Sequence, residues 1–159
     1  MEAKSLNDDM NTNGNQQISQ INQEQSSVDR DIKRLEDVNV EVLKKVCNKL
    51  FAFGVPAHVS GYKYLISAIM LTIDDPTCLR EVTGRLYPTI AAEFNTLPAR
   101  VERAIRNAIE ISFVRGNRVA LHDFFGSAVN VHKGKITNSE FIAITAQKIS
   151  LEMLDTANR

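Results

Sequence analysis

The stretch PTIAAEFNTLPARVERAIRNAIEISFVR, residues 88–115, predicts two helices joined by a tight turn. Asn95 to Pro98 interrupts the first helix. Pro98 is tolerated in the first turn of the second helix because its missing N–H would be unpaired there anyway, and we expect Thr96 to cap that helix. Two helices at this spacing are typical of a helix-turn-helix, whose second helix enters the DNA major groove.

The second helix has one apolar and one polar face. Aliphatic and aromatic residues recur at helical spacing and predict a buried stripe: Val101, Ala104, Ile105, Ala108, Ile109 and Phe113. The opposite face holds Arg100, Arg103, Arg106, Asn107 and Glu110. Arginine binds guanine in a bidentate fork and asparagine does the same with adenine, although most helices of this pattern are merely solvated surface helices.

Glu102 lies among these arginines and has two interpretations. An acidic side chain accepts a hydrogen bond from cytosine N4, so Glu102 is a candidate base-reading residue. Alternatively, Glu102 forms an ion pair with Arg106, four residues later on the same helix. The sequence favours neither interpretation.

Length, composition and charge limit the class of protein. The 159 residues, 43% of them hydrophobic, suit one domain of about 100–125 residues with an extension. Cys47 and Cys78 lie outside any CxxC spacing, which predicts reduced thiols in a cytoplasmic protein. No apolar run of about 18 residues and no signal peptide is present, so we expect a soluble protein without a membrane partner. The net charge is zero, yet residues 80–135 hold nine basic and five acidic residues, which is compatible with DNA binding.

The N-terminal segment differs in composition from the rest. We expect residues 1–34 to form a polar tail, rich in Asn, Gln and Ser and disordered in part, before a helical domain at residues 35–159. A coiled coil is the alternative, because apolar residues and the polar Asn39 follow a heptad from Ile18 to Val46. In a parallel homodimer, however, that heptad would bring like charges of its flanking acids together.

The remaining pattern predicts an all-α fold, a compact bundle of about six helices. The expected helices cover residues 35–53, 62–73, 77–94 with a break before Pro88, 98–115, 119–125 and a last helix from residue 138, capped by Thr137 or Asn138. Most apolar residues of the last helix, including Leu151 and Leu154, are expected to face inward. Val129 and Val131 alternate like a brief strand.

Four separated motifs occur in order: GVPAHVSGYKYLISAIM from Gly54, LYPTIAAEFNT, RVERAIRNAIE and TNSEFIA. Over residues 35–155 the chain therefore resembles the DNA-binding effector domain of the stage-zero sporulation response regulator. The resemblance implies a helix-turn-helix domain of the response-regulator effector superfamily, which is winged-helix-like. It also implies binding to double-stranded DNA at a TGTCGAA-like box, often in tandem copies.

The resemblance also assigns roles to single residues. The implied base-reading residues are Arg100, Glu102, Arg103, Arg106 and Asn107, and the implied backbone contacts are His58, Arg115, Lys133 and Lys135. Residues 117–131, with Arg118, His122 and Asp123, correspond to the surface that contacts the RNA polymerase sigma subunit. The last helix corresponds to the one through which tandem domains meet.

The chain departs from the family at several points. The typical member has histidine where Asn107 stands, lysine where Ser60 stands and proline where Ile136 stands. Residues 1–34 are too few and too polar to form the receiver domain that carries the phospho-accepting aspartate. We therefore expect DNA binding that phosphorylation does not gate, or a modulator that pairs with the full-length regulator without activating transcription.

Catalysis is not expected. His58, His122 and His132 are scattered, and none belongs to a Cys/His or Ser/His/Asp arrangement. The pair Asp74 and Asp75 lacks the spacing of an EF-hand loop, and no glycine-rich phosphate loop is present, so no cofactor is expected. A DNA-binding regulator and a protein-interaction module or inactive paralogue remain the two candidate functions.

Overall fold

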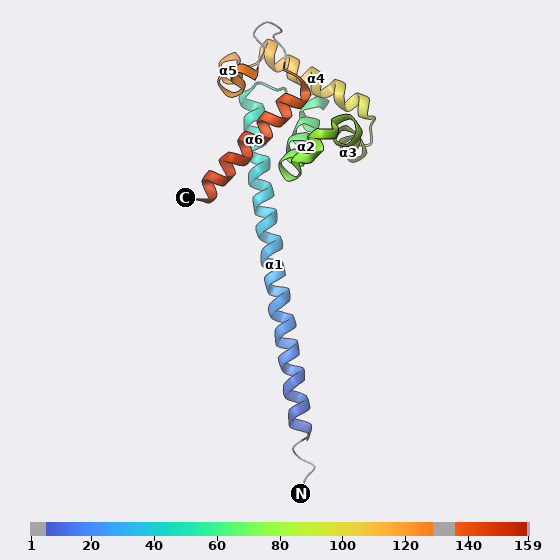
Figure 1. Cartoon of the computed structure of the whole chain (residues 1–159), viewed down its shortest axis with the longest axis vertical. Coiled ribbons are helices and arrows are strands. Elements are labelled where there is room, and N and C mark those ends of the chain that lie inside the picture. The colour runs from blue at the N-terminus through green and yellow to red at the C-terminus, as the bar shows by residue number, and fades with distance from the viewer. Residues whose placement is uncertain (1–5, 129–135, 159) are drawn as a thin grey trace. The chain divides into compact units, whose positions relative to one another are not determined.

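A computed structural model describes residues 6–128 and 136–158, with side chains described from Gly14 onward except that of Ser127. Within these residues every regular element is helical, which confirms the predicted all-α class (Figure 1). The α-helices are α1 (Leu6–Ala52), α2 (Ser60–Asp74), α3 (Tyr87–Glu93), α4 (Pro98–Arg115), α5 (Arg118–Phe125) and α6 (Asn138–Ala157). Short helices are η1 (Pro76–Glu81), η2 (Val82–Leu86) and η3 (Gly126–Ala128).

Internal contacts divide the chain into two units, residues 1–40 and residues 41–159. Helix α1 begins at Leu6, not near Leu35 as the composition suggested. No proline interrupts this stretch, and Asn, Gln and Ser disfavour a helix only mildly, so nothing in the sequence forces the helix to start later. The expected domain boundary between residues 34 and 35 stays a prediction.

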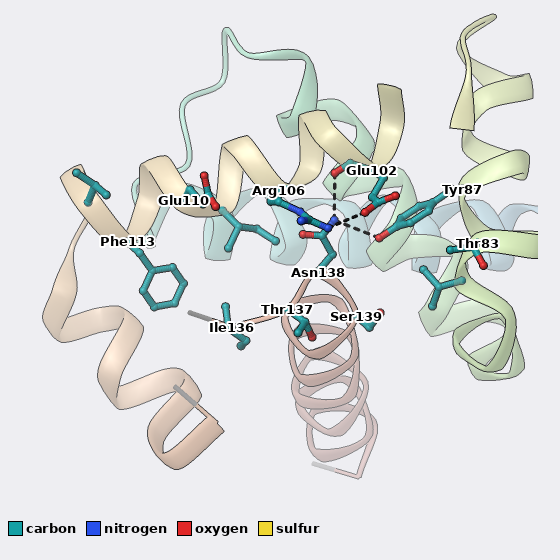
Figure 2. Close-up of a pocket in the computed structure, with 13 residues that line it drawn as sticks. Thr83, Tyr87, Glu102, Arg106, Glu110, Phe113, Ile136, Thr137, Asn138 and Ser139 are labelled. Carbon is teal, nitrogen blue, oxygen red and sulfur yellow. Dashed lines mark hydrogen bonds and ion pairs between the residues drawn. The ribbon is translucent and has the colours of Figure 1, made fainter. Parts of the chain in front are cut away.

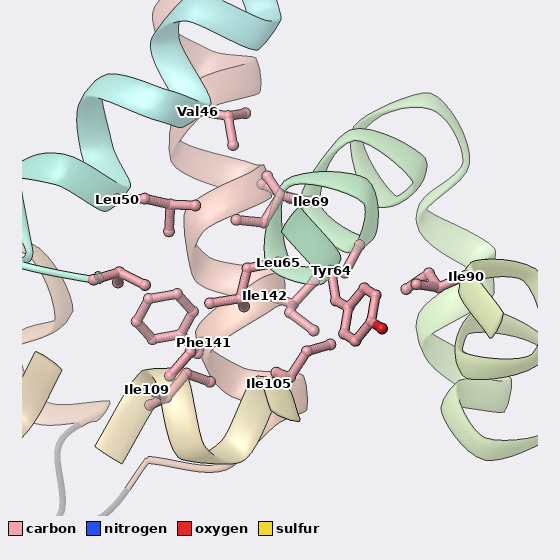
Figure 3. Close-up of a cluster of buried hydrophobic side chains, with 14 of the residues drawn as sticks. Val46, Leu50, Tyr64, Leu65, Ile69, Ile90, Ile105, Ile109, Phe141 and Ile142 are labelled. Atoms are coloured by element: carbon pink, nitrogen blue, oxygen red, sulfur yellow. The ribbon is translucent and has the colours of Figure 1, made fainter. Parts of the chain in front are cut away.

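The core of the second unit is built around α2. This helix packs against α4 and α6, and α3 packs against α4 (Figure 3). The last turns of α1 add Val46 and Leu50, both completely buried. Apolar side chains from all these helices meet in one cluster: Leu65, Ile69, Ile90, Ile105, Ile109, Phe141 and Ile142. The buried area supplies the main stabilisation, as expected for helices that are each apolar on one side.

Four phenylalanines join the end of α1 to α5 and α6. Phe53 has ring-centroid distances of 4.8 Å to Phe124 and 5.2 Å to Phe125, and Phe125 stacks on Phe141 at 4.8 Å. The ammonium of Lys148 lies 4.5 Å from the centre of the Phe124 ring and donates to the Phe124 carbonyl oxygen. These contacts fix α5, a helix of only eight residues, against the rest of the unit.

Glycine at position 61 allows α2 and α4 to approach closely. A β-carbon there would lie 2.0 Å from the backbone oxygen of Ala104 and 2.7 Å from the β-carbon of Ala108. A second close crossing joins the loop after α1 to the end of α4, where a β-carbon on Gly54 would lie 2.6 Å from the α-carbon of Gly116. Gly54 also has a φ of +76°, which side chains rarely allow. Both crossings position α4 through backbone contacts.

Some expected details differ in the structure. The segment expected as one helix before Pro88 is a 3₁₀-helix followed by a five-residue π-helix, and α3 begins at Tyr87. Leu151 and Leu154 of α6 are exposed, not inward. Beyond Ile149 the helix meets the core through another side chain, the half-buried Met153. The brief strand expected at Val129 and Val131 lies outside the described residues.

The cysteines are not linked to one another. Cys78 is buried and Cys47 is half-buried, and both are free thiols. Among the helices that the structure describes, none combines the length and the apolar character needed to cross a membrane.

Candidate nucleic-acid interface

Helices α3 and α4 form the predicted helix-turn-helix. The turn between them depends on Asn95, whose φ of +48° lies in the left-handed region that asparagine tolerates better than most residues. The amide of Thr96 then donates to the carbonyl oxygen of Ala91 over 2.8 Å and closes the end of α3. Leu97, not Thr96, is the N-cap residue of α4, and its side chain makes no cap bond. Pro98 occupies the first turn of α4, as predicted.

Helix α4 has the two faces that its sequence predicts. The buried residues are Val101, Ile105, Ala108, Ile109 and Ser112, while Ala104 and Phe113 are half-buried against the core. The exposed residues include Arg100, Arg103, Arg106 and Asn107. The core therefore fixes the rotation of α4 about its axis, and three guanidinium groups and one amide face solvent along one helix of 18 residues.

Glu102 is paired with Arg106. An oxygen of its carboxylate lies 2.6 Å from a guanidinium nitrogen of Arg106, with spacing i, i+4. The ion-pair interpretation of Glu102 is therefore realised in the unliganded chain. Both side chains are partly accessible to solvent, where such pairs contribute only about 0.3–0.5 kcal/mol. A group that binds Glu102 or Arg106 more strongly can therefore break this pair with little loss of free energy.

A buried amide connects three helices behind Glu102. The side-chain nitrogen of Asn138 donates to the Tyr87 hydroxyl and to the backbone oxygen of Glu102, each over 3.1 Å (Figure 2). Burial raises the pKa of the Tyr87 hydroxyl, although the bond from Asn138 opposes this effect. These contacts fix the start of α6 and the start of α3 against α4. The sequence names Asn138 only as a possible cap of α6 and does not predict its contact with Tyr87, since nothing in their spacing of 51 residues indicates contact.

A pocket of about 560 Å³ lies beside this polar contact, between α4 and the start of α6 (Figure 2). Its wall is apolar at Ile109, Phe113 and Ile136 and polar at Glu102 and Arg106. The further lining residues are Val82, Thr83, Tyr87, Glu110, Val114, Thr137, Asn138 and Ser139. Two of the predicted base-reading residues therefore line a hollow on the surface of the domain.

Helix α6 begins with a capping box. The Thr137 hydroxyl accepts from the Glu140 amide over 3.2 Å, and the Glu140 carboxylate accepts from the Thr137 amide over 2.9 Å. Hydrogen bonds from the Thr137 backbone and side chain lower the pKa of Glu140. Of the two predicted caps, Thr137 is the one observed. The box fixes the point at which the chain enters α6 beside the pocket.

The other predicted contact residues lie on several elements. His58 is exposed in the turn between α1 and α2, and Arg115 is exposed at the last residue of α4. Arg118, His122 and Asp123 are exposed on α5, with His122 Nδ1 3.7 Å from an Asp123 oxygen. Lys133 and Lys135 lie outside the described residues.

Asp75 is part of a local turn. Its carboxylate accepts from the Thr77 hydroxyl at 2.6 Å and from Arg85 at 2.5 Å, and these hydrogen bonds, led by that from Thr77, lower its pKa. No three His, Cys, Asp or Glu residues gather as a metal site in residues 6–128 and 136–158.

A family model matches this chain. It is described as "Sporulation initiation factor Spo0A C terminal", and the match covers residues 46–149. These residues include α2 to α5 entire, the helix-turn-helix among them, and α6 as far as Ile149. More than half of the chain is matched, and the recognition-type helix lies in the middle of the match. The chain belongs to the Spo0A C-terminal family of sporulation initiation factors, whose members are DNA-binding transcription-factor domains.

Proposed function

We propose that this chain binds double-stranded DNA at a TGTCGAA-like box by inserting α4 into the major groove. The observation that carries the proposal is the exposed face of α4, with Arg100, Arg103, Arg106 and Asn107 opposite the face that packs on the core. Arginine and asparagine form the bidentate base contacts that distinguish guanine and adenine. The family membership supports DNA as the ligand.

Glu102 has a second role in this proposal. In the free chain Glu102 neutralises Arg106, and on DNA the two side chains separate, Glu102 accepting from cytosine N4 and Arg106 contacting a base or the backbone. A solvent-accessible pair of this kind is weak, so its loss opposes binding only slightly. The pair also lowers attraction to DNA of unrelated sequence, because an acid repels phosphate.

Contacts to the sugar-phosphate backbone of DNA position α4 in the groove without distinguishing base sequence. We assign these contacts to His58, Arg115, Lys133 and Lys135. The described members of this set, His58 and Arg115, are exposed, as the role requires. Because the 159 residues contain no receiver-like segment, we propose that their binding does not depend on phosphorylation.

Two protein contacts complete the proposal. The exposed residues Arg118, His122 and Asp123 of α5 are assigned to the RNA polymerase sigma subunit. Self-association on tandem boxes is assigned to α6, and the exposed Leu151 and Leu154 support this role because a lone domain leaves both in water. The protein acts in the cytoplasm.

The proposal is tested by fluorescence-anisotropy titration of the chain against a duplex with two tandem TGTCGAA-type boxes and against a scrambled duplex. At about 150 mM salt we expect a preference for the boxes of about a thousandfold, near the low end for specific binders. Equal, weak binding to both duplexes would refute sequence-specific recognition.

The Glu102–Arg106 pair also favours one alternative function. A recognition face that is partly neutralised suits a paralogue that modulates the full-length regulator through protein contacts without activating transcription. In that case the chain would bind neither duplex specifically, and would instead alter the binding curve of the full-length regulator when mixed with it.

A further inference from the structure

The N-terminal part of α1 has an apolar stripe with no partner in the described structure. Ile18, Ile21, Val28, Ile32 and Leu35 occupy the a and d positions of a heptad, and each is between 48% and 64% exposed. All residues from Asn15 to Glu41 are exposed. A helix that leaves such a stripe in water is only marginally stable, because helices in proteins depend on packing of their apolar face. The stripe is therefore a surface that favours a second helix.

The charged residues beside the stripe are sorted by heptad position, acidic ones next to the stripe and basic ones away from it. Between residues 18 and 36 the flanking g positions carry Glu24 and Asp31, and the flanking e positions carry Asp29 and Glu36. Each of these carboxylates is exposed. The basic residues of the same stretch, Arg30, Lys33 and Arg34, fall at the outer positions f, b and c. Both borders of the stripe are thus acidic.

This arrangement disfavours a second copy of the chain as the partner. In a parallel pair, Glu24 would face Asp29 and Asp31 would face Glu36 of the other copy. In an antiparallel pair, g would face g and e would face e, and these positions are again acidic. Because e and g charges set partner choice in coiled coils, either homodimer brings like charges together.

We propose that residues 15–40 bind a helix of another protein in a two-stranded coiled coil. The a and d positions of that helix are aliphatic except opposite Gln25 and Asn39, and its e and g positions carry Lys or Arg. Oppositely charged borders then pair on both sides of the stripe, and the aliphatic residues of the two helices interlock. Gln25 and Asn39, both at a positions, favour polar residues opposite them and so fix the register. This role is separate from DNA binding and does not rest on it.

The test uses the full chain and two synthetic helical peptides of three to four heptads. Both peptides have Leu at d and Ile at a, with Asn at the a positions that face Gln25 and Asn39. One peptide has Lys at every e and g position, and the other has Glu there. Anisotropy of the labelled peptides measures binding at about 50 mM salt, where screening is modest. We expect the chain to bind the Lys-flanked peptide about tenfold more tightly or better, since four exposed pairs act together.

Two neighbouring acids provide a matched comparison. Glu36 borders the stripe at position e, whereas Asp37 lies at the outer position f. We expect Glu36→Lys to weaken binding of the Lys-flanked peptide about threefold or more, and Asp37→Lys, with the same change of net charge, to alter it less than twofold. Equal effects of the two substitutions would mean unspecific charge attraction and would overturn the proposal.

The apolar contribution is tested separately. Ile21→Asn combined with Val28→Asn keeps every charge, and we expect it to abolish binding of the Lys-flanked peptide at micromolar concentrations. Binding that survives this change, or equal binding of both peptides, would overturn the proposal. Sedimentation equilibrium of the chain alone should give a monomer, and a dimer that the double substitution dissociates would instead identify a second copy as the partner.

Discussion

At the scale of single residues, the position of a side chain on α4 decides whether it packs in the core or faces solvent. Val101 and Ile105 are completely buried, so their neighbours Arg100 and Arg103 must face solvent. Glu102 lies between the two faces, half-buried, and pairs with Arg106. The helix thus carries its arginines at positions that the core alone determines.

Arg103→Ala should reduce the affinity for the tandem box by about 1–3 kcal/mol and relax specificity at one base position, because a bidentate contact would be lost. Anisotropy titrations with matched and single-base-substituted duplexes measure this effect. Arg80→Ala, which removes an exposed arginine outside α4, is the control and should leave specificity unchanged. Loss of affinity by the same factor for box and scrambled duplex would exclude base reading by Arg103.

At the scale of elements, the helices are positioned by their ends and by close approaches at glycine. The capping box starts α6 beside α4, and the amide of Asn138 in the first turn of α6 connects to Tyr87 and to α4. Gly61 allows α2 to lie against the backbone of α4. A change at any of these points should shift the recognition helix or destabilise the unit without touching an exposed arginine.

Glu140→Gln should remove the part of the free energy of unfolding that depends on the ionised carboxylate of Glu140. The pKa of Glu140 is lowered on folding, so its contribution is fully present above the unfolded value near pH 4.3 and is lost as the pH falls through the lowered folded value. Urea unfolding at pH 7 and at pH 3.5 should show a smaller difference in the free energy of unfolding for Glu140→Gln than for the wild type. Asp155→Asn, late in α6, is the control. If both variants reduced the difference between the two pH values equally, the pH dependence could not be assigned to the capping box.

Gly61→Ala should destabilise the second unit by at least about 2 kcal/mol, because its β-carbon would meet the backbone oxygen of Ala104, which no rotamer change can move. Thermal and urea unfolding measure the loss. Gly84→Ala is the matched control, since a β-carbon there has nothing within 4 Å. If the two variants were equally stable, α2 and α4 would not approach as closely as described.

At the scale of the whole molecule, charge is divided between the two units although the total is zero. Residues 1–40 carry eight acidic and four basic residues, whereas residues 41–159 carry fifteen basic and eleven acidic residues. The unit that contains the helix-turn-helix is therefore the basic one. Its DNA affinity should depend on salt even though the chain as a whole is neutral.

The logarithm of the binding constant for a duplex with a single box should fall linearly with the logarithm of salt concentration. We expect a slope of about −2.7 to −4.5, because about three to five neutralised phosphates each contribute about −0.9. Anisotropy titrations between about 50 and 300 mM salt measure this slope. A slope near zero would mean that phosphates are not contacted, and a protein-interaction role would then be favoured.

The sequence by itself determined the helical class, the helix-turn-helix and the two faces of α4. These features depend on local patterns, namely apolar periodicity, helix-breaking residues and the cap at Thr137, which neighbouring residues specify. Whether Arg103 and Asn107 read bases stays a prediction.

Only the tertiary structure decided which distant residues meet. The contact of Asn138 with Tyr87, the crossing of Gly61 over Ala104 and the exposure of Leu151 depend on how helices pack, and no local pattern encodes that packing. Local propensity also did not predict the residue at which α1 begins. Polar residues without a proline permit a helix or an unfolded chain almost equally. The long-range contacts that position α4 come from burial of a shared core, which is a property of the whole unit.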